Sequence, residues 1–311
     1  QEIGYPVLIR PSYVLGGRGM EILSNDRQLE AYMKEAFLSP ERPLLVDEYL
    51  RNAIELDVDA VCDGDEVLIG AIMEHLEEAG IHSGDSTCFI PPQNVSKRIL
   101  AEGEDWTRRI GIELGVKGCY NIQFAIRGET LYVLEVNPRG SRTFPFVAKA
   151  TGVPLARIAA RLALGEKLCD MSVPKPQTEA VCVKAPVFPF IKLRGLDPAP
   201  GPEMKSTGEV MGSHVRPAAA YLKARLATEL PVPTEGGVYI TVKNADKYDV
   251  IPLAQELEEM GFTIYATRGT SHVLRDSGGV DVQTCYRITE GLTPDALDLM
   301  RQGKIHLIIN T

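Results

Sequence analysis

Short runs in which hydrophobic and polar residues alternate recur along this chain, and several longer runs have helical spacing instead. The alternation is clearest in residues 119–126 and 131–137, on either side of the polar segment Arg127-Gly128-Glu129-Thr130. Two such runs around a short segment with glycine are typical of a β-hairpin. We therefore predict two antiparallel strands joined by a tight turn, and we expect the first domain to be organised around them.

The second predicted strand ends in polar residues. Alternation places Leu131, Val133, Glu135 and Asn137 on one face, so a carboxylate and a carboxamide follow an apolar stretch. Burying a bare carboxylate is costly unless a cation or hydrogen bonds compensate its charge. Oxygen ligands beside guanidinium groups suit the metal ions and phosphates of phosphoryl transfer. The residues predicted to act together are Gln123, Glu135, Asn137, Arg139 and Arg142; the alternative is a hairpin with a solvated polar rim.

A shared metal ion would fix the register of this hairpin. Gln123 and Glu135 can hold one ion only if their side chains lie on the same face, as directly opposed residues of an antiparallel pair do. We therefore predict that Gln123 lies opposite Glu135, with a three-residue loop at 128–130. A two-residue turn that paired Gln123 with Leu134 would contradict the shared ion.

The segments before the hairpin predict further strands and an anion-binding loop. A strand over residues 7–11 contains Arg10, and the glycine-rich residues 12–20 can direct backbone amides at an anion. Residues 55–61 alternate strictly; their acidic face is either solvated or lets Glu48 and Glu55 hydrogen-bond a nucleotide. The other predicted elements are a helix over 26–37, strands over 43–50 and 67–73, a polar loop over 74–86 that contains His82, and a helix over 105–114 with Trp106, Ile110 and Leu114 facing inward.

The segments after the hairpin predict a connector and a second unit. An amphipathic helix over 154–164 precedes a proline-rich connector over 166–234 with one packed strand, 180–187. From residue 236 a strand, a helix (247–260), a strand and a turn (267–270) before another short helix follow in order. That order is typical of a doubly wound parallel sheet, which binds ligands at the carboxyl ends of its strands.

Composition and charge limit the functional classes. With 311 residues, 44% of them hydrophobic, the chain is large enough for two domains. The net charge of −9 argues against nucleic acid as a partner, and no apolar run or signal peptide points to a membrane. The six cysteines lack metal-binding spacing, which favours reduced thiols and a cytoplasmic location. Because the chain opens with Gln1 and ends in a predicted strand, we expect it to be an excerpt of a longer protein.

Six stretches carry a family resemblance. They are RPSYVLGGR (10–18), MEH (73–75), AGIHSGDS (79–86), EVNPR (135–139), KATG (149–152) and GPEMKSTGEVMG (201–212). In this order, and over essentially the whole chain, they resemble the carboxyl-terminal half of the large chain of carbamoyl-phosphate synthetase. The arginine after Gly16-Gly17 resembles the residue at this position in the family's second, carbamate-phosphorylating repeat; the first repeat usually has small residues there.

The resemblance implies an α+β ATP-grasp domain over residues 1–165, incomplete at its amino end, and an α/β methylglyoxal-synthase-like regulatory domain over 235–311. It implies ATP-dependent phosphorylation of carbamate, with two Mg²⁺ or Mn²⁺ ions held between the ATP phosphates by Gln123, Glu135 and Asn137. Arg139 and Arg142 would hold the carbamate. The residues implied to contact or cover the nucleotide are Arg10, Glu48, Leu50, Glu55, Gly80, Ile81, His82, Ser83, Gln123 and Glu135.

The resemblance also implies partners. They are the remainder of the large chain, a glutamine amidotransferase small chain and a small-molecule effector, in an oligomeric enzyme that feeds pyrimidine and arginine biosynthesis. The excerpt alone is expected to be inactive. Two other readings stay open: another ATP-grasp ligase, of the carboxylase or carboxylate-amine kind, or an excerpt that only binds nucleotide.

The second unit carries a candidate effector site. Hydroxyls and free amides at the start of a helix form an anion site, and the residues predicted to build it are Lys247, Thr267, Thr270, Arg287 and Asn310. The resemblance implies an effector of the UMP, UTP, IMP or phosphoribosyl pyrophosphate type. The alternative is that the threonines only cap the helix. No catalysis by this unit is expected. A methylglyoxal synthase needs a general-base aspartate in a Gly-Gly-Asp setting, and the nearest match, Gly278-Gly279-Val280-Asp281, has its aspartate one residue too late.

Overall fold

The chain divides into two compact units, residues 1–230 and 231–311. The computed structural model describes residues 3–12, 17–35, 43–176, 179–190, 195, 197–228 and 232–311. Part of the predicted glycine-rich loop, residues 13–16, and the end of the helix predicted over 26–37 lie outside the described residues.

A small antiparallel sheet begins the first unit. It has the order β2-β1-β3, with β1 at Val7–Pro11, β2 at Glu21–Leu23 and β3 at Leu44–Glu48; helix α1 covers Asp26–Glu35. Val7, Ile9 and Leu23 form its buried core, against which Leu29 and Tyr32 of α1 pack. Strand β1 therefore carries Arg10 at a fixed place on this sheet.

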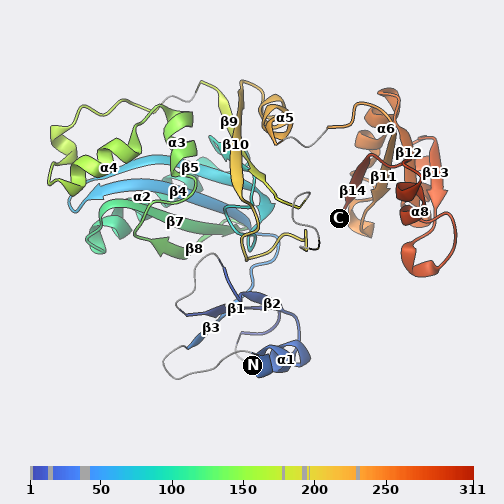
Figure 1. Ribbon diagram of the computed structural model, residues 1–311, viewed down its shortest axis with the longest axis horizontal. Coiled ribbons are helices and arrows are strands. Elements are labelled where there is room, and N and C mark those ends of the chain that lie inside the picture. The colour runs from blue at the N-terminus through green and yellow to red at the C-terminus, as the bar shows by residue number, and fades with distance from the viewer. Residues whose placement is uncertain are drawn as a thin grey trace. The chain divides into compact units, whose positions relative to one another are not determined.

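A seven-stranded antiparallel sheet forms the body of the first unit. Its order is β10-β9-β6-β5-β4-β7-β8, and it twists so that β9 and β10 run almost across β4 and β5 in the view of Figure 1. The strands and helices of this part are β4 (Ile54–Asp63), β5 (Val67–Glu78), β6 (Cys88–Ile90), α2 (Lys97–Glu113), β7 (Lys117–Arg127), β8 (Thr130–Asn137), α3 (Phe144–Thr151), α4 (Leu155–Ala163), η1 (Leu168–Asp170), β9 (Val181–Val187), β10 (Gly208–His214) and α5 (Pro217–Ala227).

Strand β4 shows how the two faces of this sheet differ. Its even-numbered residues, such as Leu56 and Val58, pack in the apolar cluster that includes Ile99 of α2. On the other face Val61 packs with the apolar residues of α3 and α4. The same face of β4 carries three acidic residues before Val61. They are Glu55, Asp57 and Asp59, which are 3%, 1% and 0% exposed. Of the two alternatives for this acidic face, the solvated one is therefore wrong, because both faces of this central strand are covered.

The central hairpin has the predicted pairing but a different turn. Gln123 lies opposite Glu135, as predicted, yet Arg127 pairs with Thr130, so the loop has two residues and not three. Gly128 has φ +60, the left-handed value that the first position of such a turn favours. A β-bulge lies between these two points, since Phe124 pairs with Val133.

The bulge also corrects the predicted faces of β8. The extra residue, Leu134, restores the register of Glu135 and reverses the alternation at that point. Leu131 and Val136 consequently pack in the cluster beneath α2, whereas Glu135 and Asn137 lie on the other face. The prediction that Leu131 and Val133 share a face with Glu135 was wrong for this reason.

Other elements depart from the predicted boundaries. Strand β5 runs on to Glu78 and takes in the first part of the segment predicted as a polar loop. Helix α2 begins much earlier than predicted because Ser96 caps it, accepting a hydrogen bond from the Ile99 amide. Leu114, predicted to face inward, is 61% exposed. Residues 166–234, predicted to form a connector with one packed strand, contribute β9, β10 and α5, and β9 pairs with β6 of the large sheet.

The second unit is a parallel sheet, as predicted. Its order is β13-β12-β11-β14, and all its pairs are parallel. The order in which successive strands are added reverses at β11, as in a doubly wound sheet. Its elements are β11 (Gly237–Thr241), η2 (Asn244–Asp246), α6 (Ile251–Glu259), β12 (Thr263–Thr267), α7 (Arg268–Asp276), β13 (Val282–Cys285), η3 (Ile288–Glu290), α8 (Ala296–Arg301) and β14 (Leu307–Asn310). In the described part of the whole chain no helix is long and apolar enough to cross a bilayer.

Candidate nucleotide and metal site

Two adjacent rows of polar residues cross the large sheet from β4 to β8. In the first row Asp57 pairs with Gln123, which pairs with Glu135. In the second row Asp59 pairs with Asn121, which pairs with Asn137. Opposed residues of antiparallel strands share a face, so the three predicted metal ligands lie together on one face of neighbouring strands.

The donor set at the end of these rows suits a hard divalent cation. Gln123, Glu135 and Asn137 offer amide and carboxylate oxygens, the ligands that Mg²⁺ and Mn²⁺ prefer. Asn137 Nδ2 donates a 2.8 Å hydrogen bond to Glu135 Oε1, which draws the two side chains together. Glu135 remains 44% exposed, open to a ligand from solvent.

Arg10 reaches this row from the small sheet. Its Nη1 lies 4.0 Å from Glu135 Oε2, and its Nε donates a 2.7 Å hydrogen bond to Asp47 on β3. Two carboxylates thus hold the guanidinium beside the candidate metal ligands. This placement is compatible with the predicted contact to phosphate, which stays a prediction.

A buried acidic cluster lies on the same face, next to Gln123. His75 Nε2 is 3.2 Å from Asp57 Oδ2, and His75 Nδ1 is 3.7 Å from Glu55 Oε1. Burial raises the pKa of Glu55 to about 7, against the opposing effect of His75. Burial also opposes protonation of His75, but Cys88, Glu55 and Asp57 together raise its pKa well above the usual range. Oxygen and nitrogen atoms of these three residues lie within 4.8 Å of one another, so a protonated His75 is paired with the two carboxylates.

The segment that was predicted to cover the nucleotide, residues 80–83, follows β5. The Gly80 amide donates a 3.4 Å hydrogen bond to Glu55 Oε2, and the His82 amide donates one of 2.9 Å to the Gly201 carbonyl. Lys184 Nζ donates a 2.8 Å hydrogen bond to the Ser83 carbonyl. Ile81 is half-buried within the segment. Three contacts from different parts of the chain therefore hold this segment beside Glu55.

The two predicted substrate arginines lie on the loop between β8 and α3. Arg139 Nη2 donates a 3.4 Å hydrogen bond to Asn137 Oδ1. Arg142 Nη1 donates a 3.3 Å hydrogen bond to the Ser206 carbonyl. Both arginines are exposed. Asp85 holds the 201–206 segment in turn, accepting 2.8 Å hydrogen bonds from the Lys205 and Ser206 amides.

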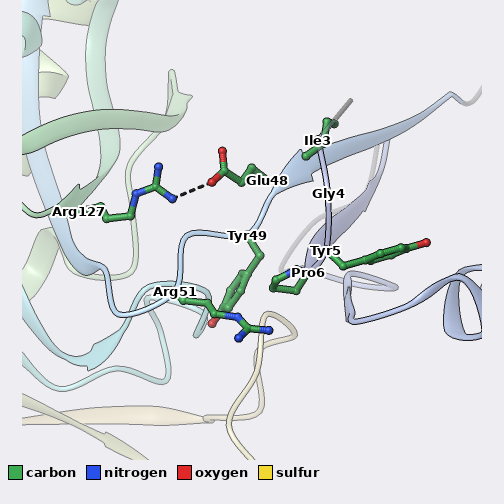
Figure 2. Close-up of a pocket in the computed structure, with 8 residues that line it drawn as sticks. All are labelled: Ile3, Gly4, Tyr5, Pro6, Glu48, Tyr49, Arg51 and Arg127. Carbon is green, nitrogen blue, oxygen red and sulfur yellow. Dashed lines mark hydrogen bonds and ion pairs between the residues drawn. The ribbon is translucent and has the colours of Figure 1, made fainter. Parts of the chain in front are cut away.

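Leu50 and Glu48, predicted to border the adenosine, have different surroundings. Leu50 packs with Leu134 and three buried alanines, so the bulge residue adds an apolar surface near Glu55 and Gly80. Glu48 instead accepts a 2.7 Å hydrogen bond from Arg127, at the turn end of the hairpin. Figure 2 shows this ion pair at the edge of a pocket of about 330 Å³, which is lined by Ile3, Gly4, Tyr5, Pro6, Glu48, Tyr49, Arg51 and Arg127. Glu48 thus forms an ion pair with Arg127, and its predicted place beside the adenosine stays a prediction.

In the second unit the predicted effector residues gather at the carboxyl edge of the parallel sheet. Thr267 ends β12 and precedes α7, Asn310 ends β14, and Arg287 follows β13. Lys247 Nζ lies beside Gly269 in the first turn of α7: a Cβ added to Gly269 would come within 2.7 Å of it. Thr267 makes no side-chain capping hydrogen bond, which does not support the alternative that it only caps the helix. Thr270 is 1% exposed.

Several residues of the site were missed in the sequence. Asp57 and Asp59 were placed on a strand face that could be solvated, His75 was placed in a polar loop, and Lys184 was placed in a connector. The signal was present in part, since three acids at alternate positions of one strand share a face, and all three are buried where that face of the sheet is covered. Lys184 carried no such signal, because only the pairing of β9 with β6 brings it to this face.

Comparisons with known proteins match both units of the chain. Residues 1–171 match the family described as carbamoyl-phosphate synthase L chain, ATP binding domain, and residues 249–311 match the MGS-like domain. The whole chain is 52% identical to the carbamoyl phosphate synthase large chain of Methanoregula boonei and 53% identical to that of Methanospirillum hungatei. It spans 29% of the length of each of these relatives.

Solved structures share the fold at low identity. N5-carboxyaminoimidazole ribonucleotide synthetase from Thermus thermophilus aligns with a TM-score of 0.54 and 16% identity, over 75% of this chain and 64% of that one. The biotin carboxylase domain of the Hydrogenobacter thermophilus 2-oxoglutarate carboxylase, solved with MgADP and bicarbonate, aligns with a TM-score of 0.50 and 23% identity, over 60% and 42%. These likenesses show the ATP-grasp fold of the first unit.

Proposed function

This chain belongs to the carbamoyl-phosphate synthase large-chain family, and on that premise we propose that its first unit phosphorylates carbamate with ATP. The observation that carries the proposal is the pair of rows that ends in Glu135 and Asn137, with Arg139 and Arg142 on the next loop. Oxygen donors beside a pair of exposed guanidinium groups suit the transfer of a phosphoryl group to a small anion.

The proposed metal ligands are Gln123, Glu135 and Asn137. Their oxygen donors support Mg²⁺, and the proposal includes two ions, with Mn²⁺ as a substitute. When bound, such ions neutralise charge on the ATP phosphates. Arg10, held by Asp47 near Glu135, would contact the same phosphates.

The chain's own residues would bind and orient the two substrates. Glu55 and residues 80–83 would hold the nucleoside, with Leu50 and Leu134 as an apolar surface beside it. Arg139 and Arg142 would hold carbamate so that one carboxylate oxygen attacks the γ-phosphorus. The bond from that phosphorus to the β-γ bridging oxygen breaks, and ADP leaves. No covalent enzyme intermediate is part of this proposal.

The decisive experiment compares Glu135→Gln with Glu129→Gln in the full-length enzyme. Glu135→Gln removes the carboxylate from the proposed metal ligands, so we expect carbamate-dependent ADP release to fall at least about a hundredfold. Glu129 lies in the hairpin turn, 79% exposed at its side chain, and its replacement is expected to change the rate less than about twofold. Normal synthesis by Glu135→Gln at saturating Mg²⁺ would refute the metal assignment. ADP release that required an amino acid and not carbamate would refute the substrate.

We further propose that the second unit binds a phosphorylated nucleotide or sugar effector. Support comes from Lys247 beside the first turn of α7 and from Thr267, whose side chain makes no capping hydrogen bond. Parallel sheets of this kind bind ligands at the carboxyl edge, where Arg287 and Asn310 also lie.

The proposed partners are the remainder of the large chain and a glutamine amidotransferase small chain, in an oligomeric cytoplasmic enzyme. Support comes from the coverage of the relatives and from the six cysteines, all described and all free. Co-purification of the full-length chain with the small chain from cell extract tests the assembly; its failure under native conditions would count against it.

A further inference from the structure

Asp59 is a fully buried carboxylate with three side-chain hydrogen bonds and no role in the reaction described above. Its Oδ1 accepts hydrogen bonds from Ser141 Oγ at 2.7 Å and from Asn121 Nδ2 at 3.0 Å. Its Oδ2 accepts one from Thr143 Oγ1, also at 2.7 Å. Ser141 and Thr143 are themselves 2.8 Å apart, between their hydroxyl oxygens. Both oxygens of this carboxylate thus accept hydrogen bonds from the loop between β8 and α3, and one also accepts from Asn121 on the neighbouring strand β7.

The hydroxyl partners of Asp59 flank Arg142. The chain leaves β8 at Asn137, in the row that begins with Asp59, and enters α3 at Phe144. Between these points Ser141 and Thr143 fold back onto Asp59. Thr143 is the N-cap residue of α3, but its side chain makes no capping hydrogen bond; its hydroxyl donates to Asp59 instead.

Packing alone does not require a carboxylate at this position. Val61, two residues further along the same face of β4, packs in the apolar cluster with Phe144 and Val147 of α3. Burying a carboxylate is costly unless hydrogen bonds compensate it, and burial raises the pKa of Asp59 to about 6 although Ser141 and Thr143 act to lower it. The chain retains a costly group where the loop that carries Arg139 and Arg142 meets the sheet.

We propose that Asp59 is a positioning residue that fixes the loop 138–143, and with it Arg139 and Arg142, for recognition of the small anionic substrate. The identity of that substrate as carbamate or carbamoyl phosphate rests on the proposed function. Asp59 contacts neither substrate nor nucleotide; it acts through its hydrogen bonds with Ser141 and Thr143. The consequence is selective: binding of the acyl substrate depends on Asp59, and binding of the nucleotide does not.

The test uses the full-length enzyme in the reverse direction, forming ATP from carbamoyl phosphate and ADP. The double variant Ser141→Ala/Thr143→Ala removes two donors to a charged acceptor, so we expect the KM for carbamoyl phosphate to rise about tenfold. The KM for ADP is expected to stay within about twofold. Thr143→Ser keeps the hydroxyl and is expected to keep the parent KM for both substrates. The variant Asp59→Asn is likewise expected to raise the KM for carbamoyl phosphate and to leave the KM for ADP within about twofold.

Two results would overturn the proposal. One is an unchanged KM for carbamoyl phosphate in the double variant; the other is an equal rise in both KM values, which indicates a general structural role. A readout without catalysis separates this inference from the proposed function. Backbone amides of residues 139–143 are expected to exchange with deuterium at least about tenfold faster in the double variant than in Thr143→Ser. If the parent makes no ATP from carbamoyl phosphate, the proposed function fails, and equal exchange in the two variants overturns the inference independently.

Discussion

At the scale of single residues, the charges buried beneath the site depend on one another. Lys184 is 0% exposed, and it is the lysine that meets the acidic face of β4 from β9. Desolvation acts to raise the pKa of Asp57, but the hydrogen bond and charge of His75 and the ammonium of Lys184 hold it below the usual range. Because Lys184 also donates to the Ser83 carbonyl, it ties this charge balance to the segment proposed to cover the nucleotide.

Replacing Lys184 with methionine is therefore expected to affect both stability and nucleotide binding. The variant leaves Asp57 with less compensation and the Ser83 carbonyl without this donor. We expect the free energy of unfolding of the first unit to fall by about 3 kcal/mol. In the full-length enzyme we expect the KM for ATP to rise about tenfold, through the loss of a charge-assisted hydrogen bond. The single tryptophan, Trp106 on α2, reports urea unfolding of the first unit alone.

Lys223→Met is the matched control. Lys223 also donates to a backbone carbonyl, that of Ser213 at 2.9 Å, but it is exposed on α5. Its replacement is expected to change stability by less than about 0.5 kcal/mol. Equal effects of the two variants would show that burial of Lys184 has no particular consequence.

At the scale of elements, the β7–β8 hairpin combines a turn that favours glycine with a bulge. Gly128 adopts φ +60, and an added Cβ would meet nothing within 4 Å, so only backbone conformation opposes a side chain there. Gly128→Ala is expected to destabilise the first unit by about 1–2 kcal/mol, the cost of a left-handed backbone for an L-residue. Urea unfolding followed by Trp106 fluorescence measures this change.

Gly103→Ala provides a control of opposite sign. Gly103 is helical, in α2, and an added Cβ would make only an ordinary contact, 3.8 Å from Leu131 Cδ2. Alanine is expected to stabilise the helix by about 0.5–1 kcal/mol. A destabilisation by Gly128→Ala no larger than that of an exposed substitution would mean that another turn type replaces this one at no cost.

The same hairpin shows how far sequence reasoning reached. The requirement that Gln123 and Glu135 share a face gave the right pair, because it rests on side-chain chemistry. The turn prediction was wrong because a bulge at Leu134 can compensate for a shorter loop, and alternation alone does not reveal an inserted residue. Lys184 could not be predicted, since its place depends on a pairing between strands far apart in the chain.

At the scale of the whole molecule, the chain combines a candidate catalytic unit with a parallel-sheet unit that has its own core. The double variant Thr267→Ala/Thr270→Ala is expected to abolish the shift in ATP affinity that nucleotide effectors cause in the full-length enzyme. The reason is the loss of two hydroxyls at the first turn of α7, where anions bind. Titration of ATP-dependent rate with and without UMP or IMP measures the shift, and basal activity is expected to stay within about twofold.

Thr263→Ala is the control for this prediction. Thr263 is an exposed threonine at the amino end of β12, and Thr267 ends the same strand at its carboxyl end. Its replacement is expected to leave the effector response intact. An unchanged response in the double variant would place the effector site elsewhere.

The pairing of β9 with β6 has a consequence for how such a protein can be rearranged in evolution. The family match for ATP binding ends at residue 171, yet β9 and β10 lie beyond it and complete one side of the same sheet. A gene fusion cut at that boundary would expose the edge of β6, and unpaired edges recruit other chains. The truncated unit would also lack Lys184, which donates to the Ser83 carbonyl. The smallest segment that can be inherited as a unit therefore extends to the end of α5, at Ala227.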